Sequence, residues 1–266
     1  MTDMPMVSLG PLTVSRFIVG GNPFCGGSHR SAEMNKRMLD WWTVARIKEA
    51  LAECERLGGN TFLGRGDNFI VRVLGEYWNE GGAIQWIGQT CPERKSVEAN
   101  IRQIHGAGAR ACYLHGGMCD RIFRDGDPEC LRSWVALIRE LGMVAGMASH
   151  NSRYPLRAEE MDLGCDFYMC CFYDLITRGG EIYEEEDRQA MARTIRAIDK
   201  PCIAFKIMAA GRNEAESAFR FAFESIKVGD PVCVGIYTED QPDQVAENVA
   251  LTARFGGRQE DRTAPS

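Results

Sequence analysis

Eight short runs of apolar or β-branched residues alternate along the chain with longer stretches in which apolar residues recur every three or four positions. The short runs have the composition of buried strands, and the longer stretches have the spacing of helices with one buried face. The runs are Arg16–Gly20, Asn60–Gly64, Ile84–Gln89, Arg110–His115, Met143–Ser149, Asp166–Phe172, Pro201–Ile207 and Pro231–Ile236. Regular alternation is typical of parallel strands joined by crossover helices. Eight such units in 266 residues predict an α/β protein, a (β/α)₈ TIM barrel.

The helices are predicted at 43–57, 69–79, 96–107, 128–141, 154–163, 185–198, 213–226 and 241–254. Residues 7–15 alternate apolar and polar around a turn, which predicts an N-terminal β-hairpin that caps the bottom of the barrel. A polar loop of about fifteen residues after the first run precedes a helix that starts near Leu39, and loops of that length are usually functional. We expect one barrel domain over residues 1–256 and a disordered polar tail over 257–266.

Composition and charge argue against several classes of partner. A formal net charge of −6 with scattered lysines and arginines disfavours nucleic acid and anionic membranes, because both select a basic face. No apolar run approaches the ~20 residues of a membrane span, and the N-terminus lacks a signal-peptide pattern, so we expect a cytoplasmic protein. The eleven cysteines show no metal-binding spacing and several fall within predicted strands, which favours buried free thiols.

Barrels of this type carry their reacting groups on the loops that follow the strands. Amides and carboxylates there bind hydroxyl groups, whereas imidazoles and amines move protons, so the polar residues at these ends predict a site for a small sugar-like carbonyl or polyol. We assign catalysis to His115, His150, Lys206 and Asp67, and substrate binding to Asn22, Arg65, Gln89, Asn151, Tyr173 and Asp174.

His115 and His150 end adjacent predicted strands, so their imidazoles could share a divalent metal ion with an oxygen from Asp67 or Asp120. Such a metal ion would polarise a carbonyl or stabilise an enediolate. The alternative is that both histidines form hydrogen bonds with the substrate.

Two further cations have alternative roles. Lys206 could act as a base or form a Schiff base with a carbonyl, or it could contact a substrate anion or pair with Asp174. Arg212 could hold a phosphate at the N-terminus of the helix that follows it, or form a surface salt bridge with Glu214 or Glu216.

An ordered set of segments over residues 9–254 resembles the aldo-keto reductase superfamily. The segments are Leu9–Phe17, Asn60–Phe62 with Leu74-Gly75, Tyr113–His115, Ala148–Asn151, Phe172–Leu175, Ile203–Gly211 and Gln244–Asn248. The resemblance implies a barrel that reduces carbonyls with NADPH. It also implies four catalytic residues: an Asp and a Tyr after the second strand, a Lys on the third and a His on the fourth.

This sequence departs from that pattern at three of the four positions. Leu63 stands at the Asp position, residues 65–68 contain no tyrosine, and Gln89 replaces the Lys, so that only His115 matches. A neutral amide cannot lower the pKa of a phenol as a nearby cation does. Reduction with a tyrosine as the acid is therefore not expected.

The nucleotide-binding segment of the family is also only partly matched. Thr238 follows the eighth run, but no Arg or Lys comes after it before Arg254. Arg212 and Thr238 are the candidate cofactor-binding residues, and NADPH is a weaker expectation than a divalent metal ion.

These residues predict a carbohydrate-converting enzyme with acid–base isomerase or lyase chemistry. In one form of this hypothesis a divalent metal ion assists the reaction. The first alternative is an NADPH-dependent oxidoreductase with a substituted proton donor, and the second is a non-catalytic barrel that binds a sugar or a protein. The expected partner is a small molecule, and nothing in the pattern favours a particular oligomer.

Overall fold

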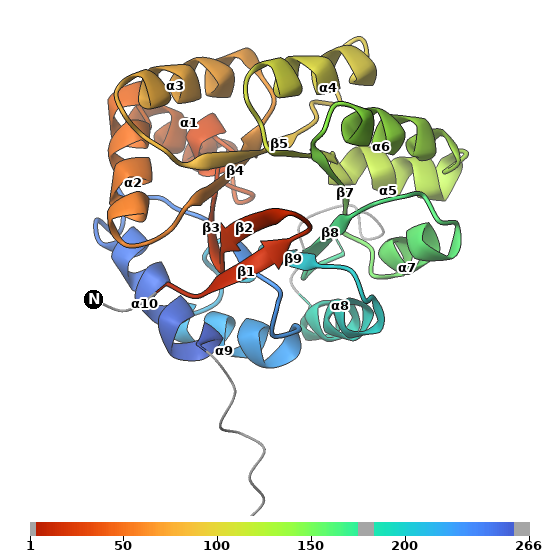
Figure 1. Ribbon diagram of the computed structural model, residues 1–266. Helices are drawn as coiled ribbons and strands as arrows, with labels where there is room; N and C mark the ends of the chain where they lie inside the picture. Colours follow the sequence, from red (N-terminus) through yellow and green to blue (C-terminus); the bar gives the residue numbers. More distant parts are fainter. Residues whose placement is uncertain (1–3, 175–183, 258–266) are drawn as a thin grey trace, which may run out of the picture.

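The computed structural model describes residues 4–174 and 184–257. Eight parallel strands close into a barrel in the order β10-β3-β4-β5-β6-β7-β8-β9 (Figure 1). The strands are β3 (Phe17–Gly20), β4 (Thr61–Arg65), β5 (Gln85–Gln89), β6 (Ala111–Leu114), β7 (Val144–Ser149), β8 (Phe167–Cys171), β9 (Cys202–Phe205) and β10 (Val232–Gly235). The predicted (β/α)₈ barrel is confirmed.

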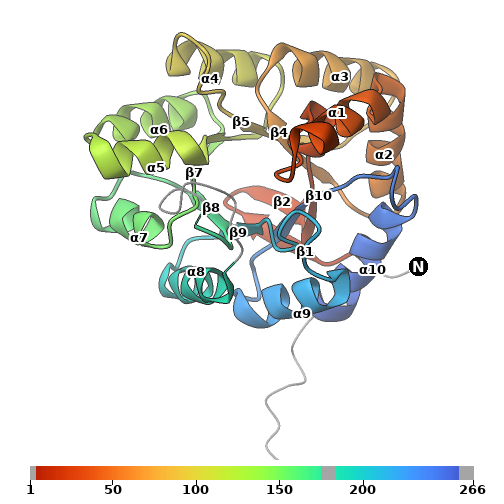
Figure 2. The same cartoon turned by 180° about the vertical axis from the view of Figure 1, so that it is seen from behind.

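A helix follows each barrel strand and packs outside it, as the apolar spacing predicts (Figures 1 and 2). These helices are α2 (Val44–Arg56), α3 (Asn68–Asn79), α4 (Val97–Gly106), α6 (Cys130–Glu140), α7 (Arg153–Glu160), α8 (Glu185–Ala197), α9 (Ala215–Ser225) and α10 (Gln244–Gly256). Several begin at a polar N-cap: the side chains of Thr43 and Ser96 each accept a hydrogen bond from a backbone N–H of the first turn.

The first loop is not the long polar connection that the sequence predicts. It contains a short 3₁₀ helix, η1 (Pro23–Cys25), and α1 (Ala32–Trp41), which Ser31 caps through the backbone N–H of Met34. The predicted start near Leu39 is wrong because only Met38 of α1 is buried, which leaves almost no apolar pattern to detect.

A second helix that the sequence analysis missed, α5 (Gly116–Asp125), follows β6 directly. Its first two residues are glycines, which disfavour a helix interior by about 1 kcal/mol each. The backbone amide of Met118 bonds to the side chain of His115, the N-cap residue. This cap and the packing of α5 against β7 stabilise a helix that local helix propensity does not predict.

The hairpin of β1 (Met6–Leu9) and β2 (Leu12–Ser15) pairs antiparallel and lies across one end of the barrel (Figure 1). Leu9 and Val14 are fully buried against inward side chains such as Ile18 and Val144. The hairpin therefore closes the N-terminal end, and α1 lies at the opposite end (Figure 2).

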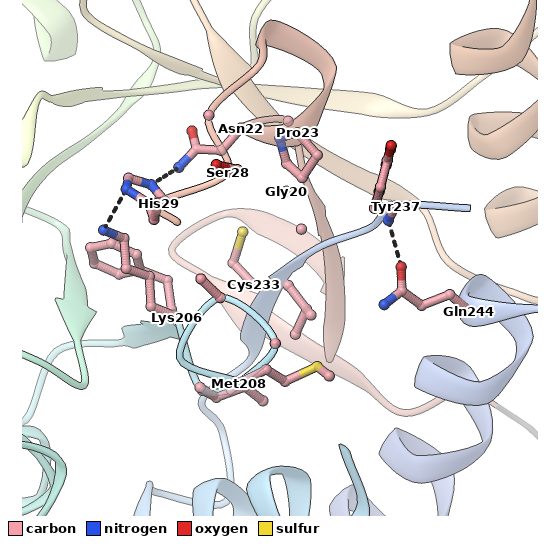
Figure 3. A pocket seen from close by; sticks show the side chains of 18 of the residues that line it. Gly20, Asn22, Pro23, Ser28, His29, Lys206, Met208, Cys233, Tyr237 and Gln244 are labelled. Atoms are coloured by element: carbon pink, nitrogen blue, oxygen red, sulfur yellow. Dashed lines mark hydrogen bonds between the residues drawn. The ribbon is translucent and has the colours of Figure 1, made fainter. Parts of the chain in front are cut away.

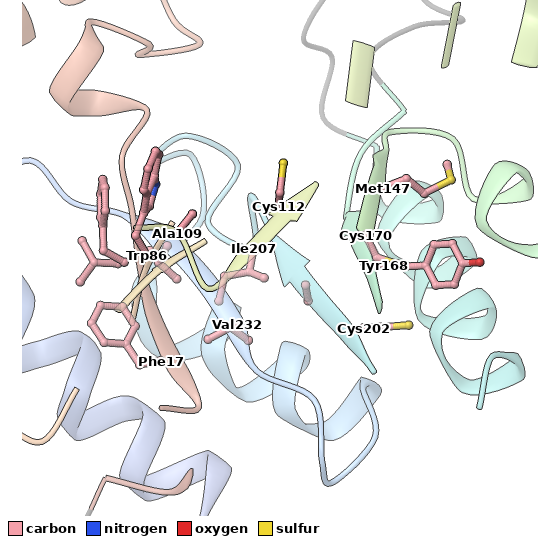
Figure 4. Packing of buried hydrophobic residues seen from close by; sticks show 14 of the residues in the cluster. Phe17, Trp86, Ala109, Cys112, Met147, Tyr168, Cys170, Cys202, Ile207 and Val232 are labelled. Carbon is pink, nitrogen blue, oxygen red and sulfur yellow. The ribbon is translucent and has the colours of Figure 1, made fainter. Parts of the chain in front are cut away.

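The larger part of the core lies between the barrel and its helices (Figure 4). Trp86 is fully buried there, and its indole N–H donates to the carbonyl of Gly64. All eleven cysteines are free, and Cys112, Cys170, Cys202 and Cys233 are buried. Of the predicted tail, residues 258–266 lie outside the described residues, so its disorder stays a prediction. No helix in the described ranges is long and apolar enough to cross a membrane.

Candidate active site

The C-terminal ends of the barrel strands enclose a cavity of about 450 Å³. Side chains alternate along a strand, so a residue two positions beyond an inward core residue also faces the barrel axis. Arg65 follows inward Leu63 in this way, and His115 follows inward Tyr113. The same rule places Gln89 after Ile87 and His150 after Ala148. Seven predicted site residues line this cavity: Asn22, Arg65, Asp67, Gln89, His115, His150 and Lys206.

His115 is held as a neutral hydrogen-bond donor. Its Nδ1 accepts the backbone N–H of Met118 at 3.3 Å, and its own backbone N–H donates to Thr90 Oγ1 at 2.9 Å. Since Nδ1 is an acceptor, the proton of the neutral ring is on Nε2. Burial and the neighbouring His150 lower the pKa of His115 to about 4, so the ring is neutral at neutral pH.

This lowered pKa makes stability depend on pH in one direction. Between the ordinary pKa of 6.5 and about 4, the unfolded chain binds a proton at His115 that the folded chain does not, so stability falls as pH falls through this window. We expect the free energy of unfolding to drop by about 2 kcal/mol more from pH 7 to pH 4.5 in the unmodified protein than in a His115→Asn variant. Urea unfolding of both proteins at the two pH values measures this difference in unfolding free energy. Equal drops in the two proteins would contradict the lowered pKa of His115.

His150 is paired with a buried carboxylate. Its Nδ1 lies 2.6 Å from Oδ2 of Asp120, a residue of α5 that is 0% exposed. Asp120, which the sequence analysis considered as a metal ligand, is thus in contact with an imidazole nitrogen. No group of three or more His, Cys, Asp or Glu side chains among the described residues is arranged to hold a metal ion, so the metal-assisted hypothesis is not carried further.

Asp67 lines the cavity, but both of its oxygens are engaged. Oδ1 accepts the backbone N–H of Ile70 as the N-cap of α3, and Oδ2 accepts from Arg65 Nε at 3.2 Å. Arg65 also pairs with Glu93. These contacts fix the guanidinium at the cavity wall, and the predicted catalytic role of Asp67 stays a prediction.

Lys206 lies where the cavity opens into a second one, and its Nζ is 3.3 Å from Nδ1 of His29. Nε2 of His29 lies 3.2 Å from Nδ2 of Asn22 (Figure 3). Lys206 and His29 both have a positive φ, 57° and 54°, a conformation that costs a non-glycine residue about 1 kcal/mol or more. The sequence analysis missed His29, because a residue within a long loop carries no periodic signal.

Tyr113 is a second residue that the sequence analysis did not place in the site. Its hydroxyl accepts a hydrogen bond from Gln89 Nε2 at 2.8 Å, and its position two residues before His115 was the available signal. Burial raises the pKa of this phenol well above its ordinary value. A phenol therefore lies at the cavity, but its pKa shift is opposite to the one that an acid working near neutral pH needs.

Three predicted substrate-binding residues are not among those that line either cavity. Asn151 Nδ2 donates to Asp174 at 3.3 Å, and its Oδ1 accepts the backbone N–H of Arg153. The hydroxyl of Tyr173, a buried side chain, accepts a hydrogen bond from Asn213 Nδ2 at 2.9 Å. The substrate-binding roles predicted for Asn151, Tyr173 and Asp174 stay predictions.

The two predicted cofactor-binding residues are also engaged elsewhere. The guanidinium of Arg212 donates to the backbone carbonyls of Ala209 and His29. Thr238 Oγ1 accepts the indole N–H of Trp41 at 3.1 Å. Neither residue lines either cavity, and the cofactor-binding roles stay predictions.

The second cavity, of about 520 Å³, is a groove between the ends of β3, β9 and β10 and the start of α10 (Figure 3). It shares Asn22, His29, Gln89, Tyr113 and Lys206 with the first cavity. The two spaces are therefore continuous, and a long ligand in the groove would reach the polar cavity.

Charges along the groove are mixed. The cations that line it are Arg30 and Lys206, and the carboxylates are Glu214, Asp240 and Glu247. Asp243, the N-cap residue of α10, makes no side-chain hydrogen bond to the first turn of the helix. The amides of Gln244 and Glu247 donate to the backbone carbonyls of Gln241 and Asp243 instead.

Comparison with known proteins identifies the fold of the barrel. No protein-family model and no curated protein sequence matches the chain. Solved structures match over nearly the whole chain, and the chain has the fold of the aldo-keto reductase superfamily, as its motifs indicate.

Three of these structures illustrate the similarity. A putative aldo-keto reductase from Pseudomonas aeruginosa is 17% identical with a TM-score of 0.64, over 94% of each chain. An aldo-keto reductase from Bacillus halodurans, in its holo form, is 12% identical with a TM-score of 0.61, over 95% of this chain and 91% of its own. A glycerol dehydrogenase from Gluconobacter oxydans is 10% identical with a TM-score of 0.54, over 100% and 99%.

Proposed function

We propose that this chain is a nicotinamide-dependent oxidoreductase that interconverts a small hydroxyl compound and its carbonyl form. The observation that carries the proposal is the continuity of the groove with the cavity that holds His115 and His150. The fold supports it, because its structural neighbours are described as aldo-keto reductases and a glycerol dehydrogenase. The isomerase or lyase chemistry expected from the sequence lacks comparable support and gives way to this alternative.

The groove fits a nicotinamide dinucleotide in shape and in backbone chemistry. Met34, Met38 and Met208 supply apolar, adaptable wall. The N-terminus of α10 lies at the groove through Gln244, and the helix dipole there favours the negative charge of a pyrophosphate. Lys206 and His29 stand at the junction, where the groove meets the polar cavity.

The carboxylates of the groove favour one of the two nicotinamide dinucleotides over the other. Glu214, Asp240 and Glu247 line the groove together with the cations Arg30 and Lys206. Arg37 pairs with Asp240, so the opposition to an additional phosphate comes mainly from Glu214 and Glu247. We propose NADH as the cofactor in preference to NADPH.

A charge variant tests this preference. Replacing both Glu214 and Glu247 by Gln removes two negative charges, each worth about 1 kcal/mol against a phosphate. Together these are worth about 2 kcal/mol, so we expect NADPH affinity to rise about thirtyfold relative to NADH affinity. Fluorescence titration of both nucleotides measures the ratio, with Glu140→Gln, an exposed carboxylate at the C-terminal end of α6, as the control. Tighter binding of NADPH than of NADH by the unmodified protein would refute the assignment.

The residues of the polar cavity would bind and orient the substrate. Nε2–H of His115 donates to the reacting oxygen, and the guanidinium of Arg65, fixed by Asp67 and Glu93, donates to a further oxygen of the substrate. The side chains of Phe205 and Ala148 form apolar wall beside them. A bound nicotinamide supplies or accepts the hydride.

The proposed function is tested by adding NAD⁺ with a panel of small polyols from glycerol to hexitols, and NADH with the matching carbonyl compounds. Nucleotide absorbance at 340 nm reports turnover, and tryptophan fluorescence reports binding. Failure of both nucleotides to bind at millimolar concentration would rule the function out.

We also propose a reducing, cytoplasmic location, because all eleven cysteines are free.

A further inference from the structure

The carboxylate of Asp120 is fully buried, yet its contacts lead to the cavity wall. Oδ1 accepts from Ser149 Oγ at 2.6 Å, and Oδ2 lies 2.6 Å from Nδ1 of His150. The backbone N–H of His150 lies 3.2 Å from each oxygen. Burying a carboxylate is costly unless its oxygens accept hydrogen bonds, and these donors satisfy that requirement.

This contact fixes the tautomer of His150. A carboxylate only accepts hydrogen bonds, so Nδ1 of His150 carries the proton and Nε2 of the neutral ring is an acceptor. His115 has the opposite arrangement, because its Nδ1 accepts the N–H of Met118. One cavity thus holds one imidazole that donates through Nε2 and one that accepts through Nε2.

Both arrangements depend on α5. His115 is the N-cap of this helix, and Asp120 lies one turn further along it. An added Cβ on Gly116 would lie 3.0 Å from Cε1 of His150, so the first turn of the helix also packs against the imidazole ring.

We propose that the His150–Asp120 pair carries the proton to and from the reacting oxygen while His115 donates a hydrogen bond to the same oxygen. This inference rests on the proposed oxidoreductase function and names the group that replaces the missing tyrosine. His150 is then a catalytic residue, and Asp120 is a positioning residue that acts through it.

The step balances in both directions. In oxidation, the hydroxyl proton of the alcohol passes to Nε2 of His150, and the carbinol hydrogen leaves with its bonding pair to the oxidised nicotinamide. The C–O bond becomes C=O, and the imidazolium later releases its proton to water. In reduction, imidazolium returns the proton to the carbonyl oxygen as hydride adds to carbon. Asp120 stabilises the imidazolium in both directions.

Other groups at the cavity are less suited to this transfer. Burial raises the pKa of Tyr113 well above its ordinary value and that of Cys25 to about 12. His115 has a pKa lowered to about 4, which disfavours an imidazolium. Lys206 and its neighbour His29 line the same cavity and remain as competing proton carriers, so Lys206 enters the test.

The experiment combines turnover with a spectroscopic signature. The chain has four histidines, so ¹⁵N-histidine NMR can assign each ring from single variants. We expect the Nδ1–H tautomer for His150 and the Nε2–H tautomer for His115. In Asp120→Asn, the His150 tautomer changes, and kcat for polyol oxidation with NAD⁺ falls about 10²–10⁴-fold, while NADH affinity is unchanged. His150→Gln should lose the same activity and serves where Asp120→Asn folds poorly.

The controls are His105→Gln, an exposed histidine at the end of α4, and Lys206→Met. An Nε2–H tautomer at His150 in the unmodified protein would overturn the pair, as would an Asp120→Asn kcat within threefold of normal. A larger loss of kcat in Lys206→Met than in His150→Gln would assign the proton to the lysine. In these cases NADH still binds and the proposed function stands, whereas failure of both nucleotides to bind removes both proposals.

Discussion

Replacing His115 by Asn is expected to lower kcat/KM for polyol oxidation about 10²–10³-fold, the usual effect of losing one donor to a developing oxyanion. A shorter amide can still accept the N–H of Met118 and so cap α5, but it cannot reach the oxygen that Nε2–H of His115 contacts. Steady-state kinetics with NAD⁺ measure this loss, and thermal unfolding should show little change.

His115→Ala separates the two roles of this residue. It removes both the donor and the cap, so we expect the same loss of activity together with about 1 kcal/mol of stability. If His115→Asn keeps full activity, His115 does not contact the reacting oxygen, and the assignment of this residue fails.

Replacing Trp86 by Ala is expected to lower the free energy of unfolding by about 3–5 kcal/mol. Trp86 is fully buried between the barrel and its helices, and its indole N–H bonds to the carbonyl of Gly64 (Figure 4). The variant leaves a cavity and an unsatisfied carbonyl, and we expect the midpoint of thermal unfolding to fall by roughly 10 °C.

Trp134→Ala is the matched control, because this partly buried tryptophan bonds through its indole to Glu98 at the surface. Its loss should be less than half that of Trp86→Ala. Equal losses of unfolding free energy in the two variants would contradict the prediction, because they would mean that the burial of Trp86 adds no stability beyond that of a surface tryptophan.

The barrel could be predicted because its strands and most of its helices follow simple periods. Runs such as Met143–Ser149 are almost entirely apolar since both faces of a parallel strand are buried. The helices α1 and α5 were not predicted from the sequence. In α1 only Met38 is buried, so there is no apolar period to detect, and α5 begins with two glycines. Tertiary contacts form both helices, and tertiary contacts are not visible in a local pattern.

The candidate site could be predicted where it lies on strands. Arg65, Gln89, His115 and His150 extend inward rows of the barrel, and the cavity contains all four. His29 could not be found, because a loop places it. The partner of His150 was misjudged because Asp120 lies on a helix that was not predicted, and its buried carboxylate meets the imidazole from behind the cavity.

The helix α5 links the two imidazoles through a single short segment, since His115 caps it and Asp120 holds His150. A designer could therefore treat residues 115–120 as a transferable cassette. Grafted into another barrel of this fold that has a histidine after the next strand, the segment would install a fixed donor and an oriented base together. A change in the position of the segment would then alter the donor and the base together.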